Sequence, residues 1–175
     1  MTISQAAAWT ALAFFPVMMV FAGLMDVMTM KIRNRLVVGL VLGYAVLAPL
    51  AGIALDEMGL SLALAGGVFL AGFTLFSMGW IGGGDAKLAT ATVLWLGAAH
   101  VVPYLVYTAL FGGALTLSVL VFRQVELPEY QEGGWNVPEW AERLHSPQAG
   151  VPYGAAMASA ALMVFPHTPW MAAII

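Results

Sequence analysis

The run from Leu88 to Phe122, LATATVLWLGAAHVVPYLVYTALFGGALTLSVLVF, contains no Asp, Glu, Lys or Arg. It is too long for a single membrane crossing, because about 20 residues are enough to cross ~30 Å of hydrocarbon. Near its middle, His100-Val101-Val102-Pro103 supplies a polar side chain and a helix breaker. We therefore predict two helices here, 85–101 and 104–122, joined by a turn.

The whole chain has the same apolar character. Its 175 residues are 62% hydrophobic and 9% charged, whereas soluble domains are roughly 45–50% apolar and 25% charged. This composition excludes an ordinary soluble domain and a disordered chain. The net charge of −3 has the wrong sign for nucleic-acid binding, and the absence of Cys excludes a thiolate nucleophile and a cysteine metal site.

The charged residues mark the limits of the apolar segments. They predict an all-α membrane protein with six transmembrane helices, over 7–27, 36–55, 60–79, 85–101, 104–122 and 151–171. Alternating connections then place every cation on one side: Lys31, Arg33, Arg35, Lys87, Arg123 and Arg143. By the positive-inside rule this side is cytoplasmic. Both termini are then outside, and 123–150 is a cytoplasmic loop before the last helix.

Two details complete this topology. Residues 1–25 lack a cationic n-region and have too long an apolar stretch for a cleaved signal peptide, so we expect them to remain as the first span. Within the 123–150 loop, the segment 138–144 begins with Pro and an acid and has Arg near its end. This order predicts a short helix.

Two of the nine acidic residues, Asp26 and Asp85, are embedded at the cytoplasmic ends of apolar helices. A carboxylate within the membrane costs about 2.5–3.5 kcal/mol even on a lenient scale, so both need an explanation. Asp85 can be the N-cap of its helix. Asp26 is near a helix C-terminus, where the dipole repels an anion; it can instead be an interfacial charge that snorkels or pairs with Lys31 or Arg33.

If the two carboxyl groups meet, their chemistry is well defined. They share one proton and titrate in two steps. One ionised carboxylate can take a proton from a water that attacks a peptide carbonyl, while the protonated partner polarises that carbonyl. The dyad then protonates the leaving amine, and either aspartate can take either part.

Three segments of the sequence together carry a resemblance to a known family. In the stretch Gly82-Gly83-Gly84-Asp85-Ala86-Lys87-Leu88, three glycines directly precede an aspartate. This stretch resembles the Gly-x-Gly-Asp signature of the type IV prepilin peptidases, which are intramembrane aspartic proteases. Asp26 followed by Lys31-Ile32-Arg33-Asn34-Arg35-Leu36 resembles the family's first-aspartate segment, with Arg33 where many relatives have Pro. Val151-Pro152-Tyr153-Gly154 resembles its Pro-Tyr-Gly segment.

The resemblance covers the whole chain and is strongest to the short, peptidase-only members that serve tight-adherence (Flp-type) pili. It implies a single membrane-embedded peptidase domain over 1–175 in the bacterial inner membrane, with its site on the cytoplasmic side. Asp26 and Asp85 would be the catalytic pair, and the partner a prepilin or pseudopilin whose leader is removed. It implies no cofactor, and we expect no N-methyltransferase activity because the cysteines of longer members are missing. The 123–150 loop then resembles an insertion.

Supporting roles follow for a further group of residues. The glycines at 82–84 leave the backbone bare for a substrate strand, and Lys87 can act on the dyad by its charge or serve as a positive-inside anchor. The Pro-Tyr-Gly segment either shapes the rim of the site or starts the last helix. The supporting residues are Gly82, Gly83, Gly84, Lys87, Asn34, Pro152, Tyr153 and Gly154.

Two other classes of function compete with a peptidase. Intramembrane carboxylates also mark ion paths, so a proton-coupled transporter is one alternative, and a non-catalytic membrane subunit of a secretion or pilus assembly is another. Neither explains the Gly-Gly-Gly-Asp-Ala-Lys element. His100, His145 and His167 share no ligand spacing, so we expect no metal site.

Overall fold

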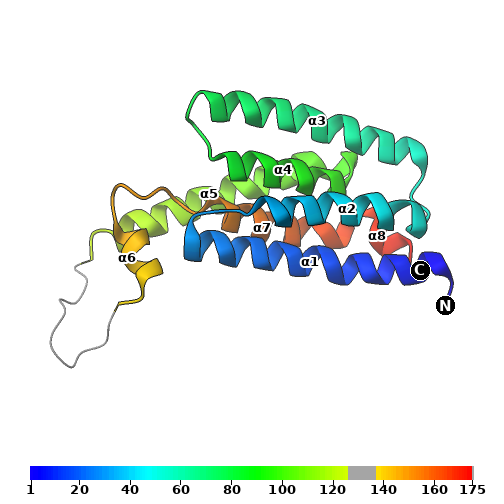
Figure 1. Cartoon of the computed structure of the whole chain (residues 1–175), viewed down its shortest axis with the longest axis horizontal. Helices are drawn as coiled ribbons and strands as arrows, with labels where there is room; N and C mark the ends of the chain where they lie inside the picture. The colour runs from blue at the N-terminus through cyan, green and yellow to red at the C-terminus, as the bar shows by residue number, and fades with distance from the viewer. Residues whose placement is uncertain (126–136, 175) are drawn as a thin grey trace.

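The computed structural model describes residues 1–125 and 137–174, and all regular structure in these segments is helical (Figure 1). The elements are α1 (Ile3–Thr29), α2 (Asn34–Ala51), α3 (Leu55–Ser77), α4 (Gly83–Leu96), α5 (Val101–Phe122), α6 (Glu139–His145), α7 (Tyr153–Val164) and α8 (Pro169–Ala172), with 3-10 turns η1 (Ala98–His100) and η2 (Phe165–His167). The predicted all-α class is confirmed. The short helix predicted at 138–144 is α6.

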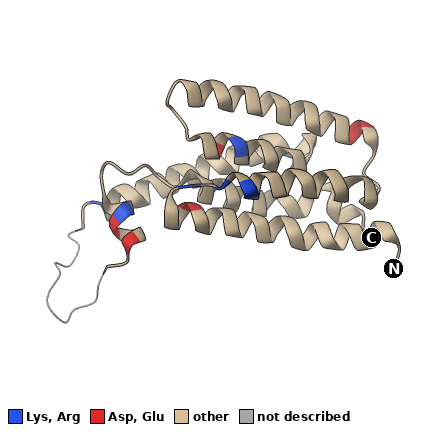
Figure 2. Ribbon diagram, viewed as in Figure 1, with Lys and Arg blue, Asp and Glu red and all other residues tan. Residues whose placement is uncertain are grey.

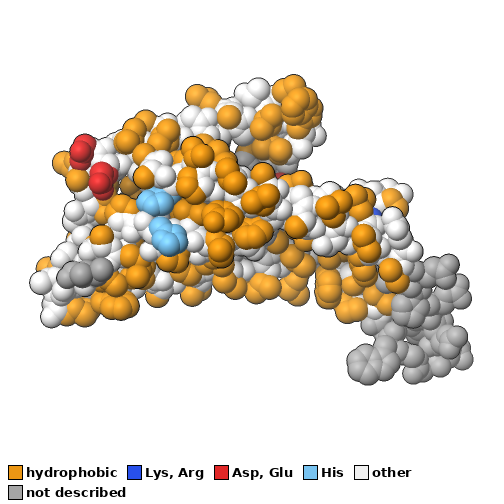
Figure 3. All heavy atoms as spheres, turned by 180° about the vertical axis from the view of Figure 1, so that it is seen from behind, with side chains coloured by type: hydrophobic (Ala, Val, Ile, Leu, Met, Phe, Trp, Pro, Cys, Tyr) orange, Lys and Arg blue, Asp and Glu red, His pale blue; other side chains and the backbone are white. Residues whose placement is uncertain are grey.

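Four helical segments of the described residues are long and apolar enough to cross a membrane. They are Ile3–Thr29, Asn34–Ala51, Leu55–Ser77 and Ala98–Phe122. Much of the surface around these helices is apolar, as the space-filling view shows (Figure 3). Contact of such an apolar surface with lipid is favourable, whereas its exposure to water is unfavourable. The chain therefore has the structure of a membrane protein.

The predicted helix 85–101 is shorter than expected. α4 ends at Leu96 because Gly97 adopts φ 75°, a conformation that glycine tolerates and that stops the helix. The predicted break at 100–103 therefore lies several residues earlier, at Gly97. Pro103 is accommodated in the first turn of α5, where a missing N–H costs nothing.

The predicted helix 151–171 is also interrupted. α7 ends at Val164 and is followed by η2 and α8. Pro166 and Pro169 account for the break, since a proline removes an N–H donor and disfavours helical backbone at the residue before it. Thr168, which precedes Pro169, is extended with ψ 165°.

α4 packs against three other helices, α2, α3 and α7. The contact with α3 is close because Gly72 faces Ala86: a Cβ added at Gly72 would lie 3.0 Å from the Ala86 Cβ. α1 in turn contacts α2 and α7, and α7 contacts α5. α4 is thus held on several sides, which fixes the position of Asp85 near its beginning.

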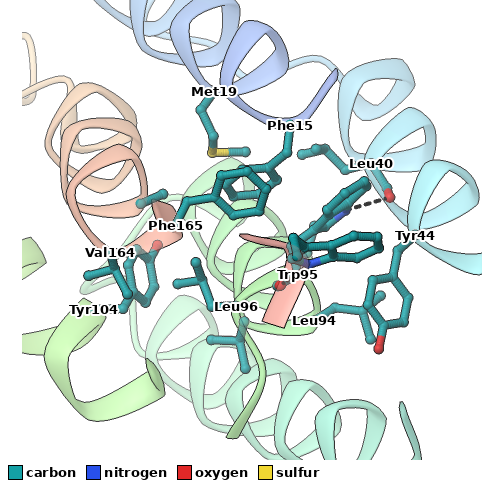
Figure 4. Close-up of a cluster of buried hydrophobic side chains, with 14 of the residues drawn as sticks. Phe15, Met19, Leu40, Tyr44, Leu94, Trp95, Leu96, Tyr104, Val164 and Phe165 are labelled. Atoms are coloured by element: carbon teal, nitrogen blue, oxygen red, sulfur yellow. Dashed lines mark hydrogen bonds between the residues drawn. The ribbon is translucent and has the colours of Figure 1, made fainter. Parts of the chain in front are cut away.

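Aromatic side chains fill the core at the C-terminal end of α4 (Figure 4). The rings of Trp95 and Trp170 stack with centroids 5.0 Å apart, and Phe15 packs against Trp95 at 5.2 Å. Both indole N–H groups are satisfied: Trp95 Nε1 donates to the Leu40 carbonyl at 2.8 Å, and Trp170 Nε1 donates to the Trp95 carbonyl at 2.9 Å. This cluster joins α1, α2, α4 and α8.

The cations of the described segments lie toward one end of the bundle, whereas acidic residues lie at both ends (Figure 2). The Lys and Arg residues of the described segments gather toward the end where α1 finishes and α6 lies. Asp56 and Glu57, in the first turn of α3, lie at the other end, together with the beginning of α1 and with α8. The bundle therefore has one cationic end and one end that carries both chain termini.

Candidate active site

Asp26 and Asp85 line the same cavity at the cationic end of the bundle, although they come from α1 and α4. The cavity has a volume of about 410 Å³. Its lining consists of Asp26, Met30, Lys31, Ile32, Gly82, Gly83, Gly84, Asp85, Gly150 and Val151. The structure thus brings together two acids that are far apart in the sequence.

Asp26 is held by the beginning of α7. Its side chain is 5% exposed, and its Oδ2 accepts a hydrogen bond from the Gly154 N–H at 2.7 Å. Gly154 is the second residue of α7, so this amide is one of the free donors of a helix N-terminus, where an anion is favoured. The unfavourable dipole of α1 is thereby offset by that of α7. Within the described residues Asp26 is not paired with Lys31 or Arg33.

Asp85 occupies the first turn of α4 rather than its N-cap. The N-cap residue is Gly82, and no side-chain hydrogen bond caps this helix among the described residues. The N-cap interpretation of Asp85 is therefore wrong. The half-buried Asp85 side chain lies over Gly82, where an added Cβ would lie 2.9 Å from Asp85 Oδ2. Gly82 leaves room for the carboxylate to face the cavity.

The other two glycines of the signature allow close packing within the protein. A Cβ at Gly83 would lie 3.2 Å from the Phe76 ring, and one at Gly84 would lie 3.2 Å from the Ile32 Cβ. They bring the beginning of α4 against α3 and against the segment between α1 and α2. All three glycines also line the cavity. That a substrate strand lies against their backbone stays a prediction.

Asn34 and Lys87 contact each other. The Lys87 Nζ donates to the Asn34 Oδ1 at 3.1 Å, which joins the beginning of α2 to the first turns of α4. Both side chains are exposed, and neither is among the described residues that line the cavity. An effect of the Lys87 charge on the dyad stays a prediction.

The Pro-Tyr-Gly segment starts α7 and also contacts the site. Pro152 is the N-cap, and the Tyr153 ring packs on Gly112, where a Cβ would lie 2.6 Å from Cε1. A Cβ at Gly154 would lie 2.8 Å from both Asp26 Oδ2 and Ile32 Cδ1. Position 154 therefore has no space for a side chain while its amide holds Asp26.

Some cavity residues were not among the predicted site residues. Met30 ends α1 with φ 52°, the one positive φ outside glycine in the described segments, and its N–H donates to the Asp26 carbonyl at 2.7 Å. Ile32, Gly150 and Val151 complete the wall. They come from connections between helices, where apolar periodicity does not predict position. In the part of the chain that the structure describes, no group of three His, Cys, Asp or Glu forms a metal site.

Fold and site together define a helical membrane protein with two acidic side chains in one cavity at the end of its bundle. The model of the type IV leader peptidase family matches residues 13–117, a range that contains both aspartates and the three glycines. The chain belongs to this family, which indicates a protease and confirms the resemblance found in the sequence. No significant match was found to a curated protein or to a solved structure.

Proposed function

We propose that the protein is an intramembrane aspartic endopeptidase that removes the leader peptide of type IV or Flp-type prepilins. The observation that carries this proposal is the shared cavity of Asp26 and Asp85. Membership of the type IV leader peptidase family supports the class of substrate. The segment Gly82 to Asp85, which resembles the signature of the prepilin peptidases, lines this cavity.

The proposed reaction needs only water and the two carboxyl groups. One carboxylate removes a proton from water as the water oxygen attacks the scissile carbonyl carbon, and the protonated partner donates a hydrogen bond to the carbonyl oxygen. The tetrahedral intermediate then collapses, the C–N bond breaks, and the amine leaves with a proton from the dyad. The Gly154 amide supports this chemistry because it fixes the Asp26 carboxylate in the cavity.

The position of the cavity suits a bond at the edge of a membrane helix. It lies at the end of the bundle, next to the exposed Lys31 and to the exposed segment that enters α2. A prepilin presents its scissile bond just before its hydrophobic helix. We infer that this helix stays in the bilayer while the leader junction enters the cavity.

We further propose a location in the bacterial inner membrane with the site on the cytoplasmic side. Six helical segments would cross or enter the bilayer, with α4 and α7 as the shorter two. The gathering of cations at the end that holds the cavity supports this orientation, and so does the position of α8 and the beginning of α1 at the opposite end. Both termini would then be outside.

Cleavage of a prepilin-like peptide by the protein in detergent tests the proposal, with Asp26→Asn and Asp85→Asn measured in parallel. Asp56→Asn is the matched control, because Asp56 is an exposed acid at the other end of the bundle. We expect both site variants to lose leader removal and the control to keep it. Undiminished cleavage by either site variant would contradict the dyad.

The same assay tests the expected lack of methyltransferase activity. With S-adenosylmethionine present, we expect the mass of the released pilin fragment to show a free, unmodified N-terminal amine. A mass increase of one methyl group would contradict this part of the proposal.

A further inference from the structure

Arg123 binds the main chain of a segment that lines the cavity, and it is not itself among the lining residues. It follows α5 as its C-cap residue, and its guanidinium donates three hydrogen bonds to main-chain carbonyls. Nε donates to Leu144 O at 2.9 Å, and Nη2 donates to Ala149 O at 2.7 Å and to Gly150 O at 3.0 Å. One side chain thus joins the end of α5 to the segment that leads from α6 into α7.

The carbonyls that Arg123 binds have a direct connection to the site. Leu144 is in the last turn of α6, where carbonyls lack helical partners and a cation is favoured. Gly150 lines the cavity together with Val151. Four residues after Gly150, the Gly154 N–H holds Asp26 Oδ2. The segment 150–154 is therefore fixed at one end by Arg123 and at the other by Asp26.

Two further contacts keep α6 in place beside this segment. Arg143 Nη1 donates to the Met28 carbonyl at 2.7 Å, which joins α6 to the end of α1. His145 Nε2 donates to the Val125 carbonyl at 2.8 Å, which joins α6 to the residues after α5. Arg123 differs from both because its partners include the cavity wall itself.

We propose that Arg123 is a positioning residue for the peptidase reaction: it sets the path of 144–150 so that α7 begins with the Gly154 amide against Asp26. This inference rests on the proposed function. It depends on the guanidinium, whose planar fork can donate to three separate carbonyls in a fixed geometry; a lysine ammonium is a point charge that cannot reproduce this fork. A role in stability alone would lower the unfolding temperature and leave kcat unchanged.

Kinetics of Arg123→Gln and Arg123→Lys in full-length protein test the proposal. For Arg123→Gln we expect kcat to fall by about tenfold or more, with KM changed less than about threefold, because the catalytic carboxylate loses its support. Arg123→Lys should recover part of the loss. Arg35→Gln, an exposed cation of α2 outside the cavity lining, is the matched control and should keep the wild-type kcat.

A second readout measures the mobility of the segment that Arg123 binds. The chain has no Cys, so a nitroxide label on Gln148→Cys reports on this segment alone. We expect Arg123→Gln to increase the label's mobility at 148 and to leave a label on Ser118→Cys, an exposed position of α5, unchanged. If Arg123→Gln does not fold, kcat and the mobility of the label at 148 are measured with Arg123→Lys instead. The expected result is then a lowered kcat and an increased mobility at an unchanged unfolding midpoint.

The outcomes separate this inference from the proposed function. An unchanged kcat or an unchanged mobility in the Arg123 variants, beside a wild type that cleaves, overturns the positioning role and leaves the peptidase assignment intact. A wild type that does not cleave, or that cleaves without its aspartates, overturns the proposed function and the positioning role with it.

Discussion

The two ends of α4 differ in packing and in polarity. At its C-terminal end Trp95 is 1% exposed and stacks on Trp170, which is also 1% exposed, within an aromatic cluster that joins four helices (Figure 4). At its N-terminal end three glycines and Asp85 line an open cavity. One helix of 14 residues therefore connects a tightly packed region to a polar, accessible one. The packed end can hold the helix rigidly while the other end remains free to receive a substrate.

The N-terminal end of α4, here called the site end, lies beside buried or half-buried acidic groups whose removal from water is unfavourable. The C-terminal end, here called the packed end, carries no such free-energy cost. Burying a carboxylate such as Asp26 away from water is unfavourable unless it is hydrogen-bonded. The Gly154 amide provides that bond, so the site depends on one backbone contact between α1 and α7. Variants at the two ends should therefore affect different quantities.

The largest expected effect is on stability at the packed end. Trp95→Ala removes a fully buried ring and leaves the Trp170 ring without its stacking partner. We expect the free energy of unfolding to fall by about 3–5 kcal/mol, measured by denaturant titration in detergent, while kcat of the folded fraction stays within about threefold of wild type. Trp80→Ala is the control, because Trp80 is 69% exposed. A stable Trp95→Ala protein without activity would remove the contrast between the two ends.

The next largest effect is on activity at the site end. Gly154→Ala places a methyl group 2.8 Å from Asp26 Oδ2, so the carboxylate or α7 must move. A misplacement of a catalytic group by about 1 Å can cost about 100-fold in rate, and we expect kcat for leader cleavage to fall by about that factor.

Gly113→Ala is the matched control for this glycine. It makes the same substitution in α5, where among the described residues nothing lies within 4 Å of the added Cβ. We expect it to keep full activity. Equal activities of the two variants would show that the Gly154 contact has no part in catalysis.

The smallest effect is expected for the exposed pair beside the site. Lys87→Met and Asn34→Ala each remove the 3.1 Å hydrogen bond between α2 and α4. Exposed polar contacts contribute about 0.5 kcal/mol, so we expect changes in kcat below about threefold. A double-mutant cycle on the unfolding free energy should give a coupling of about the same 0.5 kcal/mol. A loss of activity as large as that of Gly154→Ala would place Lys87 in the catalytic machinery.

Sequence analysis predicted the features that depend on composition and on local order. The apolar runs gave α1, α2, α3 and α5, and the order of Pro, acid and Arg gave α6. The pair of aspartates was found because a carboxylate in an apolar helix is costly, which makes Asp26 and Asp85 stand out among nine acids.

Other features depend on backbone conformation or on contacts between distant segments, which the sequence analysis did not predict. Gly97 ends α4 through its backbone conformation, although Pro103 is the stronger breaker by residue type. The Gly154 amide reaches Asp26 across 128 positions of sequence, and Arg123 reaches 144–150 through carbonyls, which every residue possesses. Such contacts follow from the tertiary arrangement and not from residue type.

The central claim is that Asp26 and Asp85 share one cavity, and cross-linking tests it most directly. Because the chain has no Cys, Asp26→Cys/Asp85→Cys provides one pair of thiols for a short bifunctional maleimide, and proteolysis between the two positions then shows whether the fragments stay joined. We predict joined fragments for this pair and separate fragments for Asp26→Cys/Asp56→Cys, whose positions lie at opposite ends of the bundle. Separate fragments for the 26/85 pair would contradict the account.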